Sequence, residues 1–312
     1  MKRIGMIGLG RMGSNMARRL RRGGAEVVGH NRSLDVARQL AAEAGLIAAE
    51  SLPQLVEALG QGPRLVWLML PAGAATQQAI DSLVPMLAPG DILVDGANAF
   101  YKDSRRRAGE LAARGIRFVD VGVSGGVWGL ENGYAMMVGG EAEAVLAIEP
   151  FLKILAPAPD KGWLHCGPSG SGHFVKMIHN GIEYGMMQAY AEGFGLMKGK
   201  LEFDLDLAAI AEMWRHGSVV RSWLLDLSAD FLQNDQELDA IAPFVADSGE
   251  GRWTAAEAIE QGVPAPVMSL ALMMRFASQG ANDYPARMLA MMRKGFGGHA
   301  VLEPGSGSDG EK

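Results

Sequence analysis

The stretch RIGMIGLGRMG, residues 3–13, decides the fold. Its apolar first part is typical of a strand buried in a parallel sheet, and a helical pattern follows over residues 12–22. Between the two, Gly8 permits a tight turn, Gly10 lets a pyrophosphate approach the backbone, and Gly13 lets the helix pack closely on the strand. The positive end of the helix then faces the bound anion. The stretch therefore predicts a dinucleotide-binding βα unit.

The residues after the second predicted strand, 26–29, bear on the choice of cofactor. A fold that prefers NAD usually places an acidic side chain here against the ribose 2′-hydroxyl. This chain has Asn31, Arg32 and Ser33 instead, which can all donate hydrogen bonds to a 2′-phosphate. We therefore expect NADP to be preferred and NAD to remain possible; the alternative is that Arg32 merely opens the next helix. The cofactor should also contact the glycine loop, which faces its pyrophosphate, through Gly8, Leu9, Gly10, Arg11, Met12 and Gly13.

Strand and helix patterns continue to alternate along the first half of the chain. Further strands are expected at 65–70, 92–95, 118–123, 134–138 and 163–165, and helices at 51–59, 75–87 and 142–155. Repeated βα units of this length imply an α/β fold with a doubly wound parallel sheet of the Rossmann type.

Ligands of such a sheet bind beyond the carboxyl ends of its strands. The loops that follow three of the strands are therefore candidate walls of the site. The cofactor should contact Leu70, Pro71, Ala72 and Asn98. A serine followed by two glycines, Ser124–Gly126, can offer a hydroxyl and backbone N–H groups to a carboxylate, although a flexible turn would have the same composition.

The second half of the chain has a helical pattern. Helices are expected from about 170 to 197 and at 207–215, 219–232, 238–242, 254–261, 269–279 and 286–293. We expect three segments: residues 1–166 as the Rossmann dinucleotide-binding domain, residues 167–304 as an all-α domain for substrate binding and oligomerisation, and residues 305–312 as a disordered tail.

A row of polar side chains marks the first of these helices. Lys176, His179, Asn180 and Glu183 stand at i, i+3, i+4 and i+7, so they share one stripe. A solvated helix also tolerates such a row. Here the flanking residues are apolar or small, which predicts a helix buried on much of its circumference. Charges on a buried helix must face each other, a ligand or a cleft, and the stripe is therefore a candidate active site.

Composition limits the other functions that need to be considered. The single cysteine, Cys166, excludes an intrachain disulfide and fits the cytoplasm, and no signal peptide or run of the roughly 18 apolar residues that span a bilayer is expected. A net charge of −6 argues against nucleic-acid binding, and the basic run at 105–107 is expected to be a solvated helix face. The six histidines show no ligand spacing, so no metal is expected.

With these residues in view, the chain resembles the short form of the decarboxylating 6-phosphogluconate dehydrogenases, within the β-hydroxyacid dehydrogenase superfamily. The glycine loop and the serine-glycine loop indicate only the superfamily. The narrower signals are HNGIEYG at 179–185 and RKGFGGH at 293–299. The resemblance covers nearly the whole chain. It implies oxidation of 6-phosphogluconate with NADP or NAD and release of carbon dioxide to give ribulose 5-phosphate.

The resemblance also assigns roles to residues. Lys176 is implied as the base at the substrate 3-hydroxyl, and Glu183 as the acid that protonates the enediol. The substrate is expected to contact Asn98, Ser124, Gly125, Gly126, His179, Asn180, Tyr184, Arg275, Arg293 and His299. Arg293 and His299 match residues that a neighbouring subunit supplies, which implies a homodimer or homotetramer. Ser248 and Glu250 depart from the lysine and threonine that the long form places near the phosphate.

Two rival interpretations remain open. A sister oxidoreductase acting on an unphosphorylated 3-hydroxy acid without decarboxylation would keep Lys176 but would not need Glu183 or the pair Arg293 and His299. A non-catalytic nucleotide-sensing module would bind the cofactor and would not need Lys176.

Overall fold

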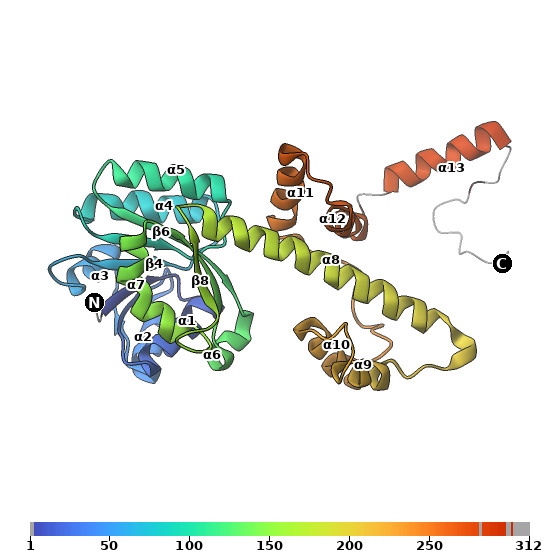
Figure 1. The fold of residues 1–312 in the computed structure, drawn as a ribbon, viewed down its shortest axis with the longest axis horizontal. Coiled ribbons are helices and arrows are strands. Elements are labelled where there is room, and N and C mark those ends of the chain that lie inside the picture. The colour runs from blue at the N-terminus through green and yellow to red at the C-terminus, as the bar shows by residue number, and fades with distance from the viewer. Residues whose placement is uncertain (1–2, 281–282, 298–300, 302–312) are drawn as a thin grey trace. The chain divides into compact units, whose positions relative to one another are not determined.

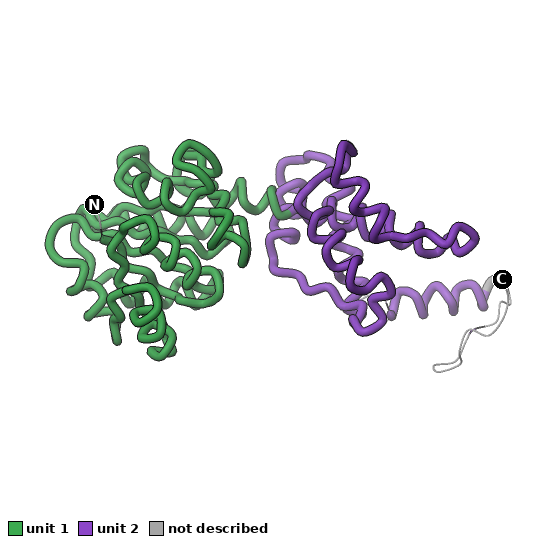
Figure 2. Tube along the Cα trace, turned by 90° about the horizontal axis from the view of Figure 1, so that it is seen from below, with its two compact units in different colours: residues 1–180 green, residues 181–312 purple. Residues whose placement is uncertain are grey.

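The structure, a computed structural model, describes residues 3–280, 283–297 and 301. His299 and the predicted tail at 305–312 lie outside the described residues. The chain forms two compact units, residues 1–180 and 181–312 (Figure 2). Helix α8, Ser171–Gly199, contains the division between them, so the two units share one helix, whereas the sequence places a domain boundary at residue 166.

The first unit is built on a single eight-stranded sheet with strand order β3-β2-β1-β4-β5-β6-β7-β8 (Figure 1). The strands are β1 (Arg3–Ile7), β2 (Glu26–His30), β3 (Ile47–Ala48), β4 (Leu65–Leu68), β5 (Ile92–Asp95), β6 (Arg117–Ser124), β7 (Ala135–Gly140) and β8 (Trp163–Gly167). β1 to β6 are parallel, in the order of a Rossmann fold, which confirms that part of the prediction.

The sheet is mostly parallel, and β7 is the exception among the described strands, because it runs antiparallel to β6. The connection between them, residues 125–134, holds only a 3₁₀ turn at Gly126–Trp128 and the short helix α6, Gly129–Asn132. A parallel return needs a crossover of a dozen or more residues, so this connection turns the chain back. Strand β8 is again parallel to β7.

Helices cover both faces of the sheet (Figure 1). One face packs on α1 (Arg11–Arg22), α2 (Leu34–Ala44) and α7 (Ala142–Leu155), and the other on α3 (Leu52–Ala58), α4 (Ala74–Leu83) and α5 (Tyr101–Ala112). Because successive strand residues point to opposite faces, Trp67 and Leu68 of β4 are both fully buried, in different cores. Ser51, at the start of the helix expected at 51–59, caps α3 by accepting from the Gln54 N–H.

The second unit is helical, as expected. Beyond α8 it contains α9 (Leu207–Arg215), α10 (Trp223–Asn234), α11 (Glu250–Gln261), α12 (Pro266–Ser278) and α13 (Asp283–Gly297). The helix expected at 238–242 is wrong: these residues form turns, and Leu238 has a positive φ of 57°. The Asp235 side chain accepts from the Glu237 and Leu238 N–H groups, and this local bonding competes with helix formation.

The flanks of α8 are less buried than the sequence suggests. Val175 and Ile182 are 38% and 52% exposed, and Met186 and Met187 are exposed as well. The polar stripe nevertheless begins at a buried position, because Lys176 is only 5% exposed. Apolar side chains in excess of what one chain can cover are typical of a surface that another molecule covers.

Candidate active site

The glycine loop after β1 has the geometry that a dinucleotide phosphate requires. Gly8 has a φ of +90°, and a Cβ there would lie 2.4 Å from the Met69 carbonyl oxygen. A Cβ on Gly13 would lie 2.0 Å from the Gly8 carbonyl oxygen, so any other residue would push α1 away from the loop. No described atom lies within 4 Å of a Cβ built on Gly10, which leaves the backbone open to a ligand. The loop therefore fits the pyrophosphate of NAD(P) at the N-terminus of α1.

Asn31 fastens this loop to the end of β2. Its Oδ1 accepts from the Leu9 N–H at 3.0 Å, and its Nδ2 donates to the Ser33 carbonyl at 3.2 Å. Arg32 and Ser33 are exposed at the same strand end, and the Ser33 hydroxyl makes no capping bond to α2. Asn31 therefore positions the loop. The side chains of Arg32 and Ser33 face solvent, where a 2′-phosphate could reach them.

Asn98 joins the loop after β5 to the end of β6. It has a positive φ of 50°, and its amide donates to the Val123 carbonyl at 3.1 Å and accepts from the Val123 N–H at 2.8 Å. This paired contact holds Asn98 beside Ser124, the last residue of β6. One donor and one acceptor position of the amide remain for ligands.

A buried ion pair supports the same loop, and it corrects the expectation of a solvated face for Arg107, whereas Arg105 and Arg106 are exposed as expected. Arg107 is 1% exposed and donates to the Asp95 carboxylate at 2.8 Å. It also donates to Gln77 Oε1 and, at 3.5 Å, to the Gly73 carbonyl. Asp95 in turn accepts from the Ala97 N–H. Arg107 therefore ties the loop after β4, which carries Leu70–Ala72, to the loop after β5.

Lys176 lies against the carboxyl-terminal half of β6. A Cβ on Gly122 would lie 2.3 Å from the Lys176 Cβ, so the missing side chain of Gly122 makes room for the lysine stem. The Lys176 amine lies 3.5 Å from His179 Nδ1, and His179 Nδ1 lies 3.1 Å from Asn180 Oδ1. Three members of the predicted stripe are thus neighbours. Half-buried Glu183 follows on the same helix, seven residues beyond the lysine and so about two turns along the same side.

The second unit brings Tyr184 and Arg275, two residues expected to contact the substrate, together with Ser248 and Glu250. Tyr184 is buried, its hydroxyl lies 3.2 Å from Ser248 Oγ, and the Arg275 guanidinium stacks 3.5 Å from its ring centroid. Glu250 is buried as well and accepts a hydrogen bond from Ser248 Oγ, so Ser248 is shared between a phenol and a carboxylate. Arg293 is exposed on α13.

A charged pair lies beside this cluster. Arg252 donates to the Asp247 carboxylate. Burial acts to raise the pKa of Asp247, but the hydrogen bond from Arg252 and the backbone N–H of Gly249 outweigh it and hold the pKa below its usual value. Arg252 is therefore engaged with a carboxylate. It is the cation nearest in sequence to Ser248 and Glu250, which themselves carry no positive charge for a phosphate.

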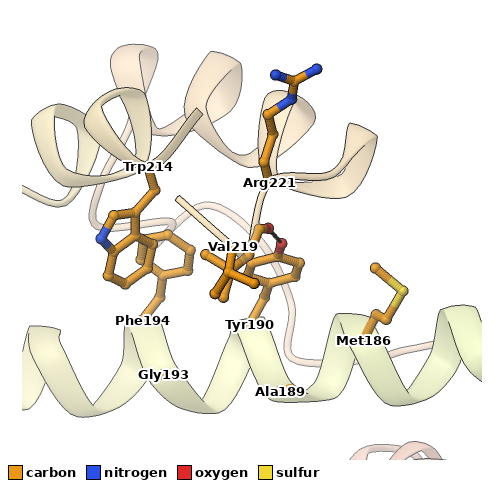
Figure 3. A pocket seen from close by; sticks show the side chains of 9 residues that line it. Met186, Ala189, Tyr190, Gly193, Phe194, Trp214, Val219 and Arg221 are labelled. Atoms are coloured by element: carbon orange, nitrogen blue, oxygen red, sulfur yellow. Dashed lines mark hydrogen bonds between the residues drawn. The ribbon is translucent and has the colours of Figure 1, made fainter. Parts of the chain in front are cut away.

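An apolar groove lies farther along α8, within the second unit (Figure 3). Its volume is about 400 Å³, and its lining includes Tyr190, Phe194 and Trp214. The Tyr190 hydroxyl is already bonded to the Val220 carbonyl and to Ser222 Oγ. With no carboxylate, histidine or lysine in its lining, the groove offers no acid or base for the chemistry expected here.

The described residues lack a metal-binding cluster and a helix that could span a membrane. They contain no cluster of three or more histidine, cysteine, aspartate or glutamate side chains that could hold a metal. Within the same residues, no helix has the length and apolar character needed to cross a membrane. Burial raises the pKa of the half-buried Cys166 thiol, which disfavours the reactive thiolate form.

Three residues that shape this site are assigned no site role by the sequence: Arg107, Gly122 and Asp120, whose carboxylate accepts from the Gly170 and His173 N–H groups at the start of α8. Asp120 is an acid in the middle of an apolar strand, and this is a signal that sequence reasoning could have used, because a buried carboxylate needs specific partners. Gly122 and Arg107 have no comparable local signal, since their importance depends on residues distant in sequence.

A Rossmann sheet with an open glycine loop, followed by a long helix that carries a buried lysine beside β6, is typical of NAD(P)-dependent dehydrogenases. Two family models refine this class: the NAD-binding domain of 6-phosphogluconate dehydrogenase matches residues 3–166, and the C-terminal domain of 6-phosphogluconate dehydrogenase matches residues 172–301. The chain belongs to the 6-phosphogluconate dehydrogenase family.

The chain is similar to enzymes of about its own length and to longer ones. The chain is 42% identical to an NAD⁺-dependent, decarboxylating 6-phosphogluconate dehydrogenase of Haloferax volcanii, over 96% of this chain and 98% of that protein. It is 38% identical to an NADP⁺-dependent, decarboxylating enzyme of Bacillus subtilis, over 89% of this chain but only 61% of that protein. The structure of Plasmodium falciparum 6-phosphogluconate dehydrogenase superposes with a TM-score of 0.82 at 29% identity, over 97% of this chain and 66% of that chain.

Proposed function

We propose that this chain oxidises 6-phosphogluconate with NAD(P) and decarboxylates it to ribulose 5-phosphate. The observation that carries the proposal is the buried Lys176 on α8, seated against Gly122 of the strand that ends in Ser124. An amine at that place can reach a substrate whose carboxylate is held by the serine-glycine loop. The family, and the names of the relatives above, support the same reaction.

In the first step, Lys176 acts as the base. It takes the proton from the substrate 3-hydroxyl as C3 is oxidised to a ketone. NAD(P), when bound, accepts the hydride from C3. The ammonium that results can then donate a hydrogen bond to the 3-keto oxygen and stabilise the enolate that forms as carbon dioxide leaves. Lys176 returns its proton to that oxygen, which gives an enediol.

In the last step, Glu183 acts as the acid. The enediol must gain a proton at the carbon that carried the carboxylate, and it gives up the 3-hydroxyl proton as the ketone re-forms. Glu183 supplies the first proton and Lys176 takes the second. Two groups about two turns apart on one helix can serve neighbouring carbons of one substrate, because residues seven apart share a side of the helix.

The remaining polar groups would bind and orient the substrate. Ser124, Gly125 and Gly126 would hold the carboxylate, and Gly125 and Gly126 both have positive φ angles, which helps backbone N–H groups to converge on an anion. Asn98, His179 and Asn180 would bind the hydroxyls, and Tyr184 and Arg275 the phosphate. Ser248 can donate to the phosphate once it releases Glu250.

Initial rates test this substrate assignment. We expect turnover with 6-phosphogluconate and at least 100-fold lower kcat/KM with an unphosphorylated 3-hydroxy acid such as 3-hydroxyisobutyrate, because the phosphate contacts are worth roughly 3 kcal/mol or more together. The reverse preference would support the sister oxidoreductase. Binding of the cofactor without turnover of either substrate would support the sensing module.

We also propose that NADP is preferred over NAD, through Arg32 and Ser33. Arg32→Ala should raise the KM for NADP by about 10- to 100-fold, since one charge-assisted contact is lost, and should leave the KM for NAD nearly unchanged. Arg38→Ala is the matched control, because this arginine of α2 is exposed and engaged with Glu50. Equal effects of Arg32→Ala on both cofactors would refute the role of Arg32.

We further propose a homo-oligomer in which Arg293 and His299 complete the site of a neighbouring subunit. Exposed apolar residues of the second unit support it, among them Ile182, Met186, Met187, Leu289 and Met292. Arg293→Ala should lose most activity, and mixing it with inactive Lys176→Met subunits should restore activity, because hybrid assemblies contain one complete site. Mixtures that stay inactive after subunit exchange would contradict the shared site.

A further inference from the structure

We infer that Asp120 is a positioning residue that sets the place of Lys176 by capping α8 from within the sheet. The inference rests on the proposed function, since it concerns the base of that reaction. Asp120 lies on β6 two residues before Gly122, and its side chain has no exposed surface.

The Asp120 carboxylate accepts two backbone N–H groups at the start of α8. Oδ1 accepts from Gly170 at 2.6 Å, and Oδ2 accepts from His173 at 2.9 Å. The first N–H groups of a helix have no partner within the helix, and the helix dipole favours a negative charge beside them. A carboxylate of the sheet thus does what an N-cap side chain usually does locally, and it fixes α8 to β6.

Glycines allow this contact to be unusually close. A Cβ on Gly139 of β7 would lie 2.6 Å from the Gly172 amide nitrogen and 2.7 Å from Asp120 Oδ1. A Cβ on Gly172 would lie 2.5 Å from the Met137 carbonyl oxygen. The first turn of α8 is therefore in backbone contact with β6 and β7, and it has no room to slide or rotate.

Lys176 follows His173 by three residues, one turn beyond the capped N–H. Its stem packs on Gly122, on the strand that carries Asp120. Helix α8 thus contacts β6 at two points, the hydrogen bonds to Asp120 and the packing of the Lys176 stem on Gly122. A shift at the cap would move the lysine relative to the carboxyl ends of the strands. Asp120 is not itself a catalytic residue, because both of its oxygens are bonded and it is fully enclosed.

Asp91 offers a matched comparison within the same sheet. It is 1% exposed and accepts from the Arg64 N–H at 2.7 Å and the Ala88 N–H at 2.8 Å. It precedes β5, so it lies at the amino end of the parallel strands, opposite the edge where the ligands bind. Asp91 also pairs with the Arg64 guanidinium at 2.7 Å. Asp91→Asn therefore imposes the same chemical change on a buried carboxylate that accepts two backbone N–H groups and has no link to α8.

The test compares Asp120→Asn with Asp91→Asn in the full-length protein, with 6-phosphogluconate and the preferred cofactor. We expect Asp120→Asn to lower kcat per cofactor-binding site by about 10- to 100-fold, as a small misplacement of a catalytic group does. The Kd of the cofactor should stay within about twofold, because the glycine loop is untouched. The primary isotope effect on kcat for substrate deuterated at C3 should be at least as large as in the wild type.

Asp91→Asn should lower Tm but leave kcat per site unchanged. A purely structural role of Asp120 would lower the number of cofactor-binding sites and leave kcat per site and the isotope effect at wild-type values, which would overturn the inference. Equal losses of kcat per site in both variants would also overturn it.

If Asp120→Asn does not fold, Gly139→Ala decides the question, since it keeps the carboxylate but separates α8 from β7. Gly139→Ala should lower kcat per site and leave the Kd of the cofactor unchanged. A wild-type kcat in Gly139→Ala would count against the inference, and so would a failure of Gly139→Ala to fold. If the wild type prefers another 3-hydroxy acid, the substrate assignment fails. Asp120→Asn and Asp91→Asn can then be compared with that acid, so a failure of the substrate assignment is distinguishable from a failure of the inference about Asp120.

Discussion

Replacing Lys176 by methionine should lower kcat by roughly 10³- to 10⁴-fold, because the reaction then has no base at the 3-hydroxyl and no cation beside the enolate. Methionine has a similar length, is apolar and suits a side chain that is 5% exposed, so the fold should tolerate it. The Kd of the cofactor should stay close to the wild-type value, since the glycine loop lies on other elements. Initial rates of NAD(P)H formation measure the first quantity, and quenching of tryptophan fluorescence measures the second.

Lys153→Met provides the control for the general effect of losing a lysine. Lys153 lies on α7, is exposed and pairs with Glu149 four residues earlier. Its replacement should leave kcat within about twofold, as surface ion pairs contribute little. Turnover of Lys176→Met at more than a tenth of the wild-type rate would contradict the role of Lys176 as the base of the reaction.

Replacing Glu183 by glutamine should lower steady-state kcat by roughly 10²- to 10⁴-fold, because an amide cannot act as the acid that protonates the enediol. The oxidation step does not need this acid. In a single turnover, Glu183→Gln should therefore still form about one NAD(P)H per site, whereas Lys176→Met should form none on the same timescale. Rapid mixing with absorbance detection of NAD(P)H distinguishes the two variants.

Glu192→Gln is the matched control for this variant. Glu192 lies on the same helix, is exposed and accepts a hydrogen bond from Gln188. It should behave like the wild type in both measurements. Steady-state rates of Glu183→Gln equal to the wild type would remove Glu183 from the mechanism and would favour the non-decarboxylating oxidoreductase.

The parts of the fold that follow from local patterns could be predicted. The glycine loop needs only a strand, three glycines at fixed spacing and a helix, and the structure contains each of these in order. The stripe that begins at Lys176 depends only on helix periodicity, and the structure places Lys176, His179 and Asn180 together. Ser51 could be read as a cap because capping depends on residues close in sequence.

The parts that depend on distant residues could not be predicted. Arg107 looks like one member of a basic surface run until Asp95 and Gln77 are placed beside it. Gly122 has no local feature that sets it apart, and its importance appears only when α8 packs on β6. The direction of β7 depends on whether the connection before it can hold a crossover, and strand patterns alone do not contain that information.

The apolar flanks of α8 show a different limit of sequence reasoning. Apolar composition predicts that Ile182 and Met186 are covered, but it does not say by what, and one chain leaves them exposed. The same pattern would fit a core helix or an interface helix. The proposal of a site shared between subunits makes α8 an interface helix, and the subunit-mixing experiment tests that proposal.

The central claim is that the chain both oxidises and decarboxylates 6-phosphogluconate, with the base and the acid supplied by one helix. The most direct test is to supply 6-phosphogluconate labelled at C1 and to measure labelled carbon dioxide and NAD(P)H in the same reaction. The account predicts one carbon dioxide released for each NAD(P)H formed. NAD(P)H formation with the label retained in the product would contradict it.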